Sequence, residues 1–488
     1  MNRRGFIAQT EVIYLINELN FAKFNGCARQ AYLIEHGKDS YKSRQDKVYL
    51  SSRLRDIQRD MLNSFPPGVR VFGDVRNAAL DTKHIIEKEE QVVFNATFLI
   101  SGASARCDVI MRNGDAYDIY AVRPTSRYTR WIDEVLYCKI IMEKAGFKAG
   151  NCYVGAIDKE ESKGSILSLY NVDNKRREKK IAEKLNTIFS QLKAKNEPGS
   201  VLSKQCGACP YLSKCFETDE NSIFSLKSIQ FNKKMSLYQR GVKTIDEYVK
   251  LGECDAKTLR EIAVRSTDED VYNKEEIKVF LNSLKYPLGF LDFETMEVFV
   301  PNDAVIKPMD TVITQFSYHL IEKEGDTPKH FEFIGDGESY CEREAAKKLI
   351  ECIKSDHTVL MYSDYERICI ERVIARLPVF KSELEAIKNN LVDLEKPFSK
   401  KMLVNRRMEG KSSLKKVLPA LYPDDDNLDY TKMKIQNGQQ AESVYARLCR
   451  MSPEEKEIAI RDLKEYCALD TLAMIKLWEK LEFYGKMV

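Results

Sequence analysis

The hexapeptide FLDFET, residues 290–295, carries two carboxylates in an apolar and aromatic setting. The apolar flanks predict a buried strand, and because side chains alternate along a strand, Asp292 and Glu294 share one face. Two buried carboxylates at this distance repel each other unless a cation or a proton lies between them. The spacing therefore predicts that a cation or a proton lies between Asp292 and Glu294.

A second pair of polar side chains lies in the late stretch KEYCALDTLAM, residues 464–474. Tyr466 and Asp470 are four residues apart and therefore share one face of a helix. Asp470 is flanked by Leu, Ala and Met, where an unpaired carboxylate is out of place. Carboxylate oxygens are ligands of the kind that hard cations such as Mg2+ and Mn2+ prefer.

Three cysteines in QCGACPYLSKC have the spacing of metal ligands. Cys206, Cys209 and Cys215 form C-x2-C-x5-C, and the Gly and Pro between them let the backbone turn tightly enough to aim three thiolates at one point. Cys27, in FNGCARQAYL, is our candidate for the fourth ligand. A set of four thiolates indicates either Zn2+ or an iron–sulfur cluster.

The composition limits the class of protein. A chain of 488 residues is too long for one core and predicts two or three domains. With 43% hydrophobic and 31% charged residues it is globular, and it has neither a membrane-spanning run nor a signal peptide, which predicts a cytoplasmic protein. The odd number of cysteines, 13, argues against a disulfide framework.

The charge is unevenly distributed along the chain. Residues 1–200 contain 33 Lys and Arg against 25 Asp and Glu, whereas residues 286–488 contain 30 against 36. A basic first part suits contact with a polyanion, and an acidic last part suits cation binding. The asymmetry favours a nucleic-acid partner.

The hydrophobic patterns divide the chain into three regions. Residues 1–215 predict a mixed domain with strands at 92–101, 104–112 and 117–123 and helices at 130–146 and 174–195. Residues 216–285 predict a helical connector. Residues 286–488 predict strands at 287–294, 310–321, 329–335 and 357–363, with helices at 341–355 and 365–377. A last helix begins at Ser452, with an N-cap, a Pro and a capping-box Glu, and runs to residue 481. This order is typical of a ribonuclease-H-like fold.

A strand with D-x-E and a late helix with Y-x3-D resembles the DEDDy class of 3′–5′ exonucleases. The resemblance implies two Mg2+ or Mn2+ ions that clamp the scissile phosphate, with Asp292, Glu294 and Asp470 as ligands. It also implies that the hydroxyl of Tyr466 orients the attacking water.

The class uses a fourth acid from the middle of the fold. We favour Glu366, because its Tyr-Glu pair resembles that motif and begins a helix. Asp364 is the next alternative, followed by Asp393.

Several longer segments resemble a bacterial family of uncharacterised proteins: FLDFETMEVFVP, TQFSYHL, KSSLKKVLPALYP, KIQNGQQA and YCALDTLAM, in this order. In that family a DEDDy-type domain follows a RecB-like, restriction-endonuclease-type nuclease domain that carries an iron–sulfur cluster. The resemblance implies a [4Fe–4S] cluster, with Zn2+ as the alternative, on Cys27, Cys206, Cys209 and Cys215. It also implies that three lysines contact the phosphates of a nucleic acid: Lys411, Lys415 and Lys416.

The first domain departs from the RecB-like pattern, which uses an Asp, then E-x-K on the next strand, then a Gln on the following helix. Asp108 fills the first position, but the second motif reads YAVRPTS, with Ala121 at the Glu position and Arg123 at the Lys position. Ala cannot bind a metal, and Arg is a poor substitute for Lys beside an attacking water. The Gln position falls on Cys138 or Tyr137. We therefore predict that this site is inactive and that the domain binds nucleic acid.

Two functions from different classes remain. In the first, the protein is a metal-dependent 3′–5′ exonuclease on DNA or RNA, with its chemistry in residues 286–488. In the second, it is a non-catalytic nucleic-acid-binding or scaffold protein. A further alternative is that Asp118 or Asp115 restores the first site. Neither function involves a membrane, and the sequence does not indicate a protein partner.

Overall fold

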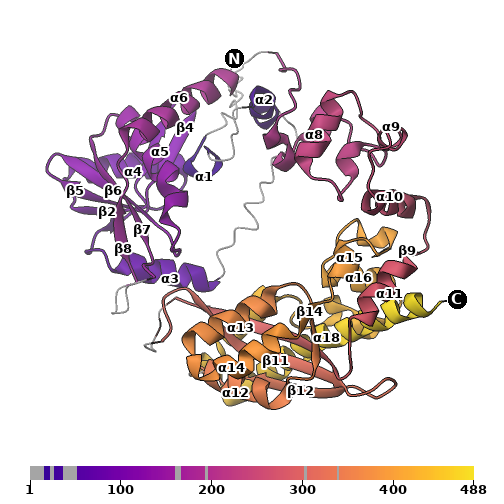
Figure 1. The fold of residues 1–488 in the computed structure, drawn as a ribbon. Helices are drawn as coiled ribbons and strands as arrows, with labels where there is room; N and C mark the ends of the chain where they lie inside the picture. Colours follow the sequence, from indigo (N-terminus) through magenta and orange to yellow (C-terminus); the bar gives the residue numbers. More distant parts are fainter. Residues whose placement is uncertain are drawn as a thin grey trace, which may run out of the picture. The chain divides into compact units, whose positions relative to one another are not determined.

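The chain folds into two compact units, which consist of residues 1–201 with 307–309 and of residues 202–306 with 310–488. The computed structural model describes residues 16–21, 27–36, 52–159, 166–192, 196–299, 301, 305–337 and 340–487. Each unit contains helices and a sheet of its own (Figure 1). The predicted mixed α/β, multidomain class is therefore confirmed. The helices of the predicted connector and the segment QCGACPYLSKC lie in the second unit.

The first unit is built on a six-stranded sheet of order β1-β2-β5-β6-β7-β8. These strands are β1 (Val69–Arg70), β2 (Val92–Phe94), β5 (Val109–Asn113), β6 (Ala116–Val122), β7 (Ala149–Ala156) and β8 (Ser168–Asn171). A separate hairpin consists of β3 (Thr97–Ile100) and β4 (Ala103–Arg106). The helices are α1 (Glu18–Phe21), α2 (Ala28–His36), α3 (Ser52–Asn63), α4 (Val75–Glu87), α5 (Ile132–Lys144) and α6 (Lys175–Leu192). One apolar core joins α5 and α6 to the sheet and the hairpin.

Two of the strands predicted in this unit are each broken in two. The predicted strand 92–101 is divided into β2 and β3, because Asn95 adopts a φ of 57° in the left-handed region, which ends an extended strand. The predicted strand 104–112 is divided into β4 and β5 at residues 107–108. The two halves of each prediction belong to different sheets.

The second unit contains a five-stranded sheet of order β12-β11-β10-β13-β14. Its strands are β10 (Leu288–Val298), β11 (Asp310–Ile321), β12 (Lys329–Ile334), β13 (Thr358–Met361) and β14 (Leu391–Asp393). The pairs β10–β11 and β11–β12 are antiparallel, whereas β10–β13 and β13–β14 are parallel. The predicted antiparallel meander followed by helix–strand alternation is confirmed, and β14 is an addition to it.

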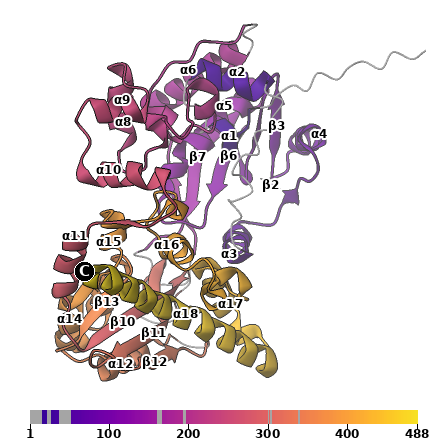
Figure 2. The same ribbon diagram turned by 90° about the vertical axis from the view of Figure 1, so that its right-hand side faces the viewer.

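Helices cover both faces of this sheet (Figures 1 and 2). One core joins the sheet to α12 (Glu342–Cys352), α13 (Tyr365–Arg376) and α14 (Lys381–Asn389). The other core joins it to α16 (Leu414–Leu421), α17 (Gly438–Tyr445) and α18 (Pro453–Lys486). As predicted, α18 begins with a capping box between Ser452 and Glu455 and with Pro453 in its first turn.

The rest of the second unit is made of short elements. The remaining helices are α7 (Leu212–Cys215), α8 (Phe231–Gln239), α9 (Ile245–Lys250), α10 (Ala256–Ala263), α11 (Lys274–Asn282) and α15 (Lys396–Ser399). A two-stranded sheet pairs β9 (Val271–Tyr272) with β15 (Leu403–Val404).

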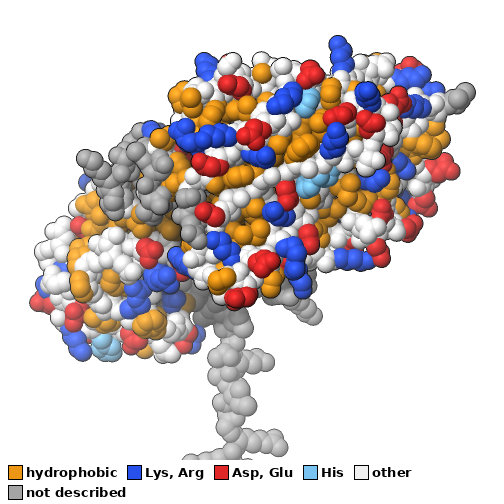
Figure 3. Space-filling model, turned by 90° about the horizontal axis from the view of Figure 1, so that it is seen from below, with side chains coloured by type: hydrophobic (Ala, Val, Ile, Leu, Met, Phe, Trp, Pro, Cys, Tyr) orange, Lys and Arg blue, Asp and Glu red, His pale blue; other side chains and the backbone are white. Residues whose placement is uncertain are grey.

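One face of the described surface carries charges of both signs among hydrophobic side chains (Figure 3). On the face shown in Figure 3, side chains of Lys and Arg are interspersed with those of Asp and Glu. No helix in the described part of the chain is both long and apolar enough to cross a membrane.

Candidate metal centre

Strand β10 presents alternate side chains to the two cores of the second unit. Leu291 and Phe293 are buried against α12–α14, whereas Leu288 and Phe290 are buried in the core that contains α18. Asp292 and Glu294 continue the two-residue spacing of Leu288 and Phe290. Their carboxylates therefore lie on the α18 side of the sheet, as this spacing predicts.

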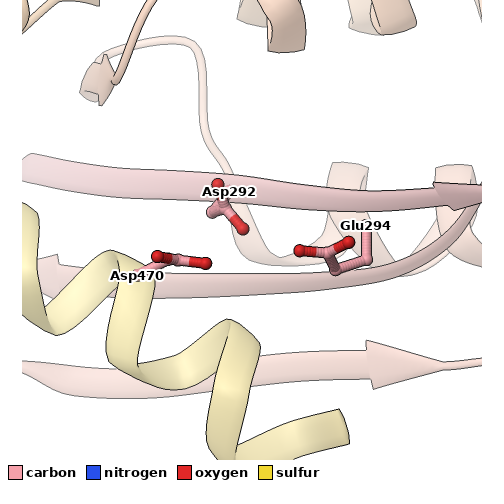
Figure 4. A group of neighbouring side chains, drawn as sticks. All are labelled: Asp292, Glu294 and Asp470. Carbon is pink, nitrogen blue, oxygen red and sulfur yellow. The ribbon is translucent and has the colours of Figure 1, made fainter. Parts of the chain in front are cut away.

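Asp470 reaches the same place from α18. Carboxylate oxygens of Asp292, Glu294 and Asp470 all lie within 4.8 Å of one another. Figure 4 shows the three carboxyl groups gathered together, with Asp470 on the yellow helix. Asp470 is 6% exposed, and the other two are partly buried. The fold therefore brings together the acids that the sequence predicts to meet.

The three carboxyl groups hold their protons more tightly than usual. Burial, followed by the charges of Asp470, Glu366 and Glu294, raises the pKa of Asp292 well above its ordinary value. Burial and Asp470 raise the pKa of Glu294 to about 8, although Lys415 acts in the opposite direction. Burial raises the pKa of Asp470 to about 6. Without a cation, the cluster is therefore partly protonated near neutral pH.

Hydrogen-bond donors hold two of these acids in place. The hydroxyl of Tyr430 donates to Oδ1 of Asp470 at 2.6 Å. Tyr430, Lys415 and Tyr466 all lower the pKa of Asp470, against the effect of burial. The thiol of Cys467 donates to Oδ2 of Asp292 at 3.5 Å. Burial raises the pKa of Cys467 well above its ordinary value, so in the metal-free chain this thiol stays a protonated donor.

Lys415 contacts a residue of this centre, whereas Lys411 and Lys416, which the sequence analysis grouped with it, have other partners. Its Nζ donates to the hydroxyl oxygen of Tyr466 at 2.9 Å. The side chains of Lys411 and Lys416 instead form ion pairs with Glu409, at 3.7 and 3.1 Å. The phosphate contacts predicted for these lysines stay a prediction.

The three middle acids have different surroundings. Glu366 is buried in the first turn of α13, 3% exposed, and its pKa is raised to about 8 by burial, with further contributions from Asp470 and Asp393. Asp364 is exposed and contacts Arg367. Asp393 accepts hydrogen bonds from the backbone N–H groups of residues 363 and 395. Only Glu366 affects the pKa values of both Asp292 and Glu294, which favours it as the fourth acid.

The donor set fits a hard divalent cation. The converging ligands are carboxylate oxygens, which Mg2+ and Mn2+ prefer over nitrogen and sulfur. In addition, Oε2 of the buried Glu366 has no hydrogen-bond partner among the described residues. A buried carboxylate oxygen without a partner is costly, and a bound ion would remove that cost. Asp292, Glu294 and Asp470 are therefore the residues that would hold such an ion, whereas Glu366 is not part of the group whose oxygens lie within 4.8 Å of one another and stays a prediction as the fourth acid.

At the predicted site of the first unit, the positively charged side chain of Arg123 lies between two acids. Arg123 donates from Nη1 to Oδ2 of Asp108 at 2.5 Å and from Nη2 to Oε1 of Glu134 on α5. Burial disfavours the charged guanidinium, but Asp108 and Glu134 outweigh this effect and raise the pKa of Arg123. The ring of Trp131 lies 5.0 Å from the guanidinium carbon. A single guanidinium thus pairs with both acids, and the inactivity of this site stays a prediction.

The other positions expected at that site are occupied by core residues. Tyr137 is fully buried and donates to the carbonyl oxygens of Ile16 and Ser104, and Cys138 is also buried, 4% exposed. Asp118 accepts a hydrogen bond from the backbone N–H of residue 151 at 2.7 Å, and the exposed Asp115 pairs with Lys148. The contacts of Asp118 and Asp115 are therefore with groups other than Asp108.

The predicted cluster cysteines lie in different units of the fold. Cys27 precedes α2 in the first unit, whereas Cys206 and Cys209 lie in and after a short 3-10 helix (Lys204–Ala208) of the second unit. Cys215 ends α7. The [4Fe–4S] cluster and its Zn2+ alternative stay predictions.

Sequence reasoning missed three residues that belong to these sites. Tyr430 lies in a short 3-10 helix, 40 residues before the carboxylate that it contacts, and no local pattern marks it. Glu134 follows the predicted Arg123 motif by 11 residues, and its position in the first turn of a predicted helix was the available signal. Glu18 on α1 has a pKa raised to about 7 by burial, with Glu134 and Asp108 also contributing.

One family comparison covers part of this centre. Residues 289–413 match a family described as a domain of unknown function (DUF2779). The matched segment includes Asp292, Glu294 and Glu366 but ends before Asp470. No match was found among curated proteins. The match covers about a quarter of the chain and carries no assigned chemistry.

Because the pKa of Glu294 is near 8 in the folded chain and about 4.3 in an unfolded one, metal-free stability should fall as pH rises between these values. Below this window both states are protonated, and within it only the unfolded state loses the proton. Glu294→Gln should therefore raise the melting temperature in EDTA, and its advantage over the wild type should grow from pH 5 to pH 8. Thermal melts over this range test the prediction, with the exposed Glu344→Gln as the control. A Glu294→Gln variant that melts below the wild type at every pH would contradict it.

Arg123→Met should destabilise the first unit. It leaves Asp108 and Glu134 partly buried without their cation, a change that costs about 3–5 kcal/mol in comparable buried pairs. Urea unfolding followed by circular dichroism measures the loss, and Arg127→Met, an exposed arginine in the same loop, is the control. Equal unfolding midpoints for the two variants would show that the ion pairs contribute little.

Proposed function

We propose that the second unit is a metal-dependent 3′–5′ exonuclease that acts on DNA or RNA. The observation that carries this proposal is the convergence of Asp292 and Glu294 on β10 with Asp470 on α18, within 4.8 Å. The strand order β12-β11-β10-β13-β14 also supports a ribonuclease-H-like fold, in which the acids lie on the central strand and the last helix.

In this proposal, each residue of the metal centre has its own role in phosphodiester hydrolysis. Two divalent ions would activate a water molecule and stabilise the leaving oxygen. Asp292, Glu294, Asp470 and Glu366 would hold them, and the buried sheet would keep the carboxylates in position. Tyr466, one turn before Asp470 on α18, would orient the water through its hydroxyl.

In the same proposal the first unit, RecB-like in its fold, binds nucleic acid without cutting it. Its support is Arg123, whose guanidinium already occupies the space between Asp108 and Glu134. The cytoplasmic location and the cysteine-bound cluster belong to this proposal as well.

The test uses the purified full chain with 5′-labelled single-stranded DNA and RNA in Mg2+ or Mn2+. We expect a ladder that shortens from the 3′ end and is reduced at least about 100-fold in Asp470→Asn, since removing one ligand of a catalytic metal removes most of its charge stabilisation. Asp462→Asn is the matched control, because Asp462 also lies on α18 but pairs with Arg461.

Two results would contradict the proposal. Loss of cleavage in Asp108→Asn with full activity in Asp470→Asn would place the chemistry in the first unit. Binding of either polymer without cleavage would indicate the alternative, a non-catalytic nucleic-acid-binding or scaffold protein.

A further inference from the structure

Lys415 makes a set of contacts that its neighbours do not make. Its Nζ donates to the hydroxyl oxygen of Tyr466 at 2.9 Å and to the carbonyl oxygen of Gln436 at 2.7 Å. Lys411 and Lys416, in the same segment, pair with Glu409. Of these three lysines, Lys415 alone has its ammonium directed at the metal centre.

Two tyrosine rings flank this ammonium. Its nitrogen lies 5.0 Å from the ring centroid of Tyr430 and 4.9 Å from that of Tyr466, within the range of cation–π attraction. The two rings meet edge to face at 6.3 Å. The hydroxyl of Tyr430 donates to Asp470, and Tyr466 also lowers the pKa of Asp470, so the ammonium, the two phenols and the carboxylate interact as one group.

The donors and acceptors fix the direction of each hydrogen bond. An ammonium group has donors only, so the oxygen of Tyr466 must accept from Lys415. The hydroxyl proton of Tyr466 therefore cannot point towards Lys415. Because this side of the oxygen accepts from Lys415, the rotation of the hydroxyl is restricted.

We propose that Lys415 is a positioning residue of the metal centre, which acts by fixing the hydroxyl of Tyr466 and not by contacting the phosphate backbone. This proposal rests on the proposed function, since Tyr466 is there the residue that orients the attacking water. It replaces, for Lys415, the backbone contact that the sequence suggests.

The contact itself can be tested without any nuclease activity. Protein with 13C at Cζ of its 24 tyrosines gives one resonance per ring, and Tyr466→Phe identifies the resonance of Tyr466 by its loss. Lys415→Met should shift that resonance, because the phenol oxygen loses a charged donor. Lys432→Met, a lysine that pairs with Asp426 at the surface, should leave it unchanged. An unshifted Tyr466 resonance in Lys415→Met would overturn the proposal.

The role in turnover is tested with a double-mutant cycle. Lys415→Met should lower kcat by roughly tenfold to a hundredfold, the range for a lost charged hydrogen bond, with little change in KM. Lys415→Arg, which keeps the charge and the donors, should recover part of the loss. Lys415→Met combined with Tyr466→Phe should be no slower than the slower single variant. Losses that multiply, or an effect on KM alone, would overturn the positioning role and indicate a backbone contact.

The resonance experiment and the kinetic experiment together distinguish a failure of this proposal from a failure of the proposed function on which it rests. A wild-type chain that cuts neither polymer would reject the exonuclease, and the tyrosine resonance would still decide whether Lys415 holds Tyr466. Melting temperatures of the variants identify any loss that is due to unfolding, and Lys415→Arg then provides the conservative comparison.

Discussion

The second unit depends on holding three mutually repelling carboxyl groups within one small space. Asp292 and Glu294 are held by the antiparallel pairing of β10 with β11, where they lie opposite Ser317 and Gln315. Asp470 is fixed by α18, a helix that is capped at its start and buried on one face from Ala459 onward. Burial and the neighbouring carboxyl groups raise the pKa values of Asp292 and Glu294, so the metal-free cluster lowers the stability of the fold. In the proposed function a bound cation would offset this loss.

The two units differ in how the negative charges of their neighbouring acids are compensated. In the first unit, Asp108 and Glu134 share the guanidinium of Arg123, so the cation is part of the chain. In the second unit, Lys415 lowers the pKa values of Glu294 and Asp470, but burial still leaves them raised, and among the described residues Oε2 of Glu366 has no hydrogen-bond partner. The proposed chemistry is assigned to the second unit, because three carboxyl groups converge there within 4.8 Å.

Local patterns in the sequence predicted the features that depend on residues a few positions apart. The D-x-E and Y-x3-D pairs, the capping box of α18 and the alternation of β10 follow from the periods of strands and helices, and the structure shows all of them. Contacts between distant segments were not predictable, such as Tyr430 with Asp470 or Lys415 with Tyr466. The break between β2 and β3 was missed because it depends on the backbone conformation of a single residue, Asn95, inside an apolar run. The DNA or RNA preference depends on contacts with a partner, and short spacing carries no information about it.

The central claim is that the acids of the second unit form a divalent-metal site, and titration with Mn2+, followed by calorimetry and by electron paramagnetic resonance, tests it most directly. The account predicts saturable binding to the wild type and to Asp108→Asn, and loss of that binding in Asp292→Asn and in Asp470→Asn. Binding that survives both of the latter substitutions but disappears in Asp108→Asn would contradict it, because the metal would then belong to the first unit.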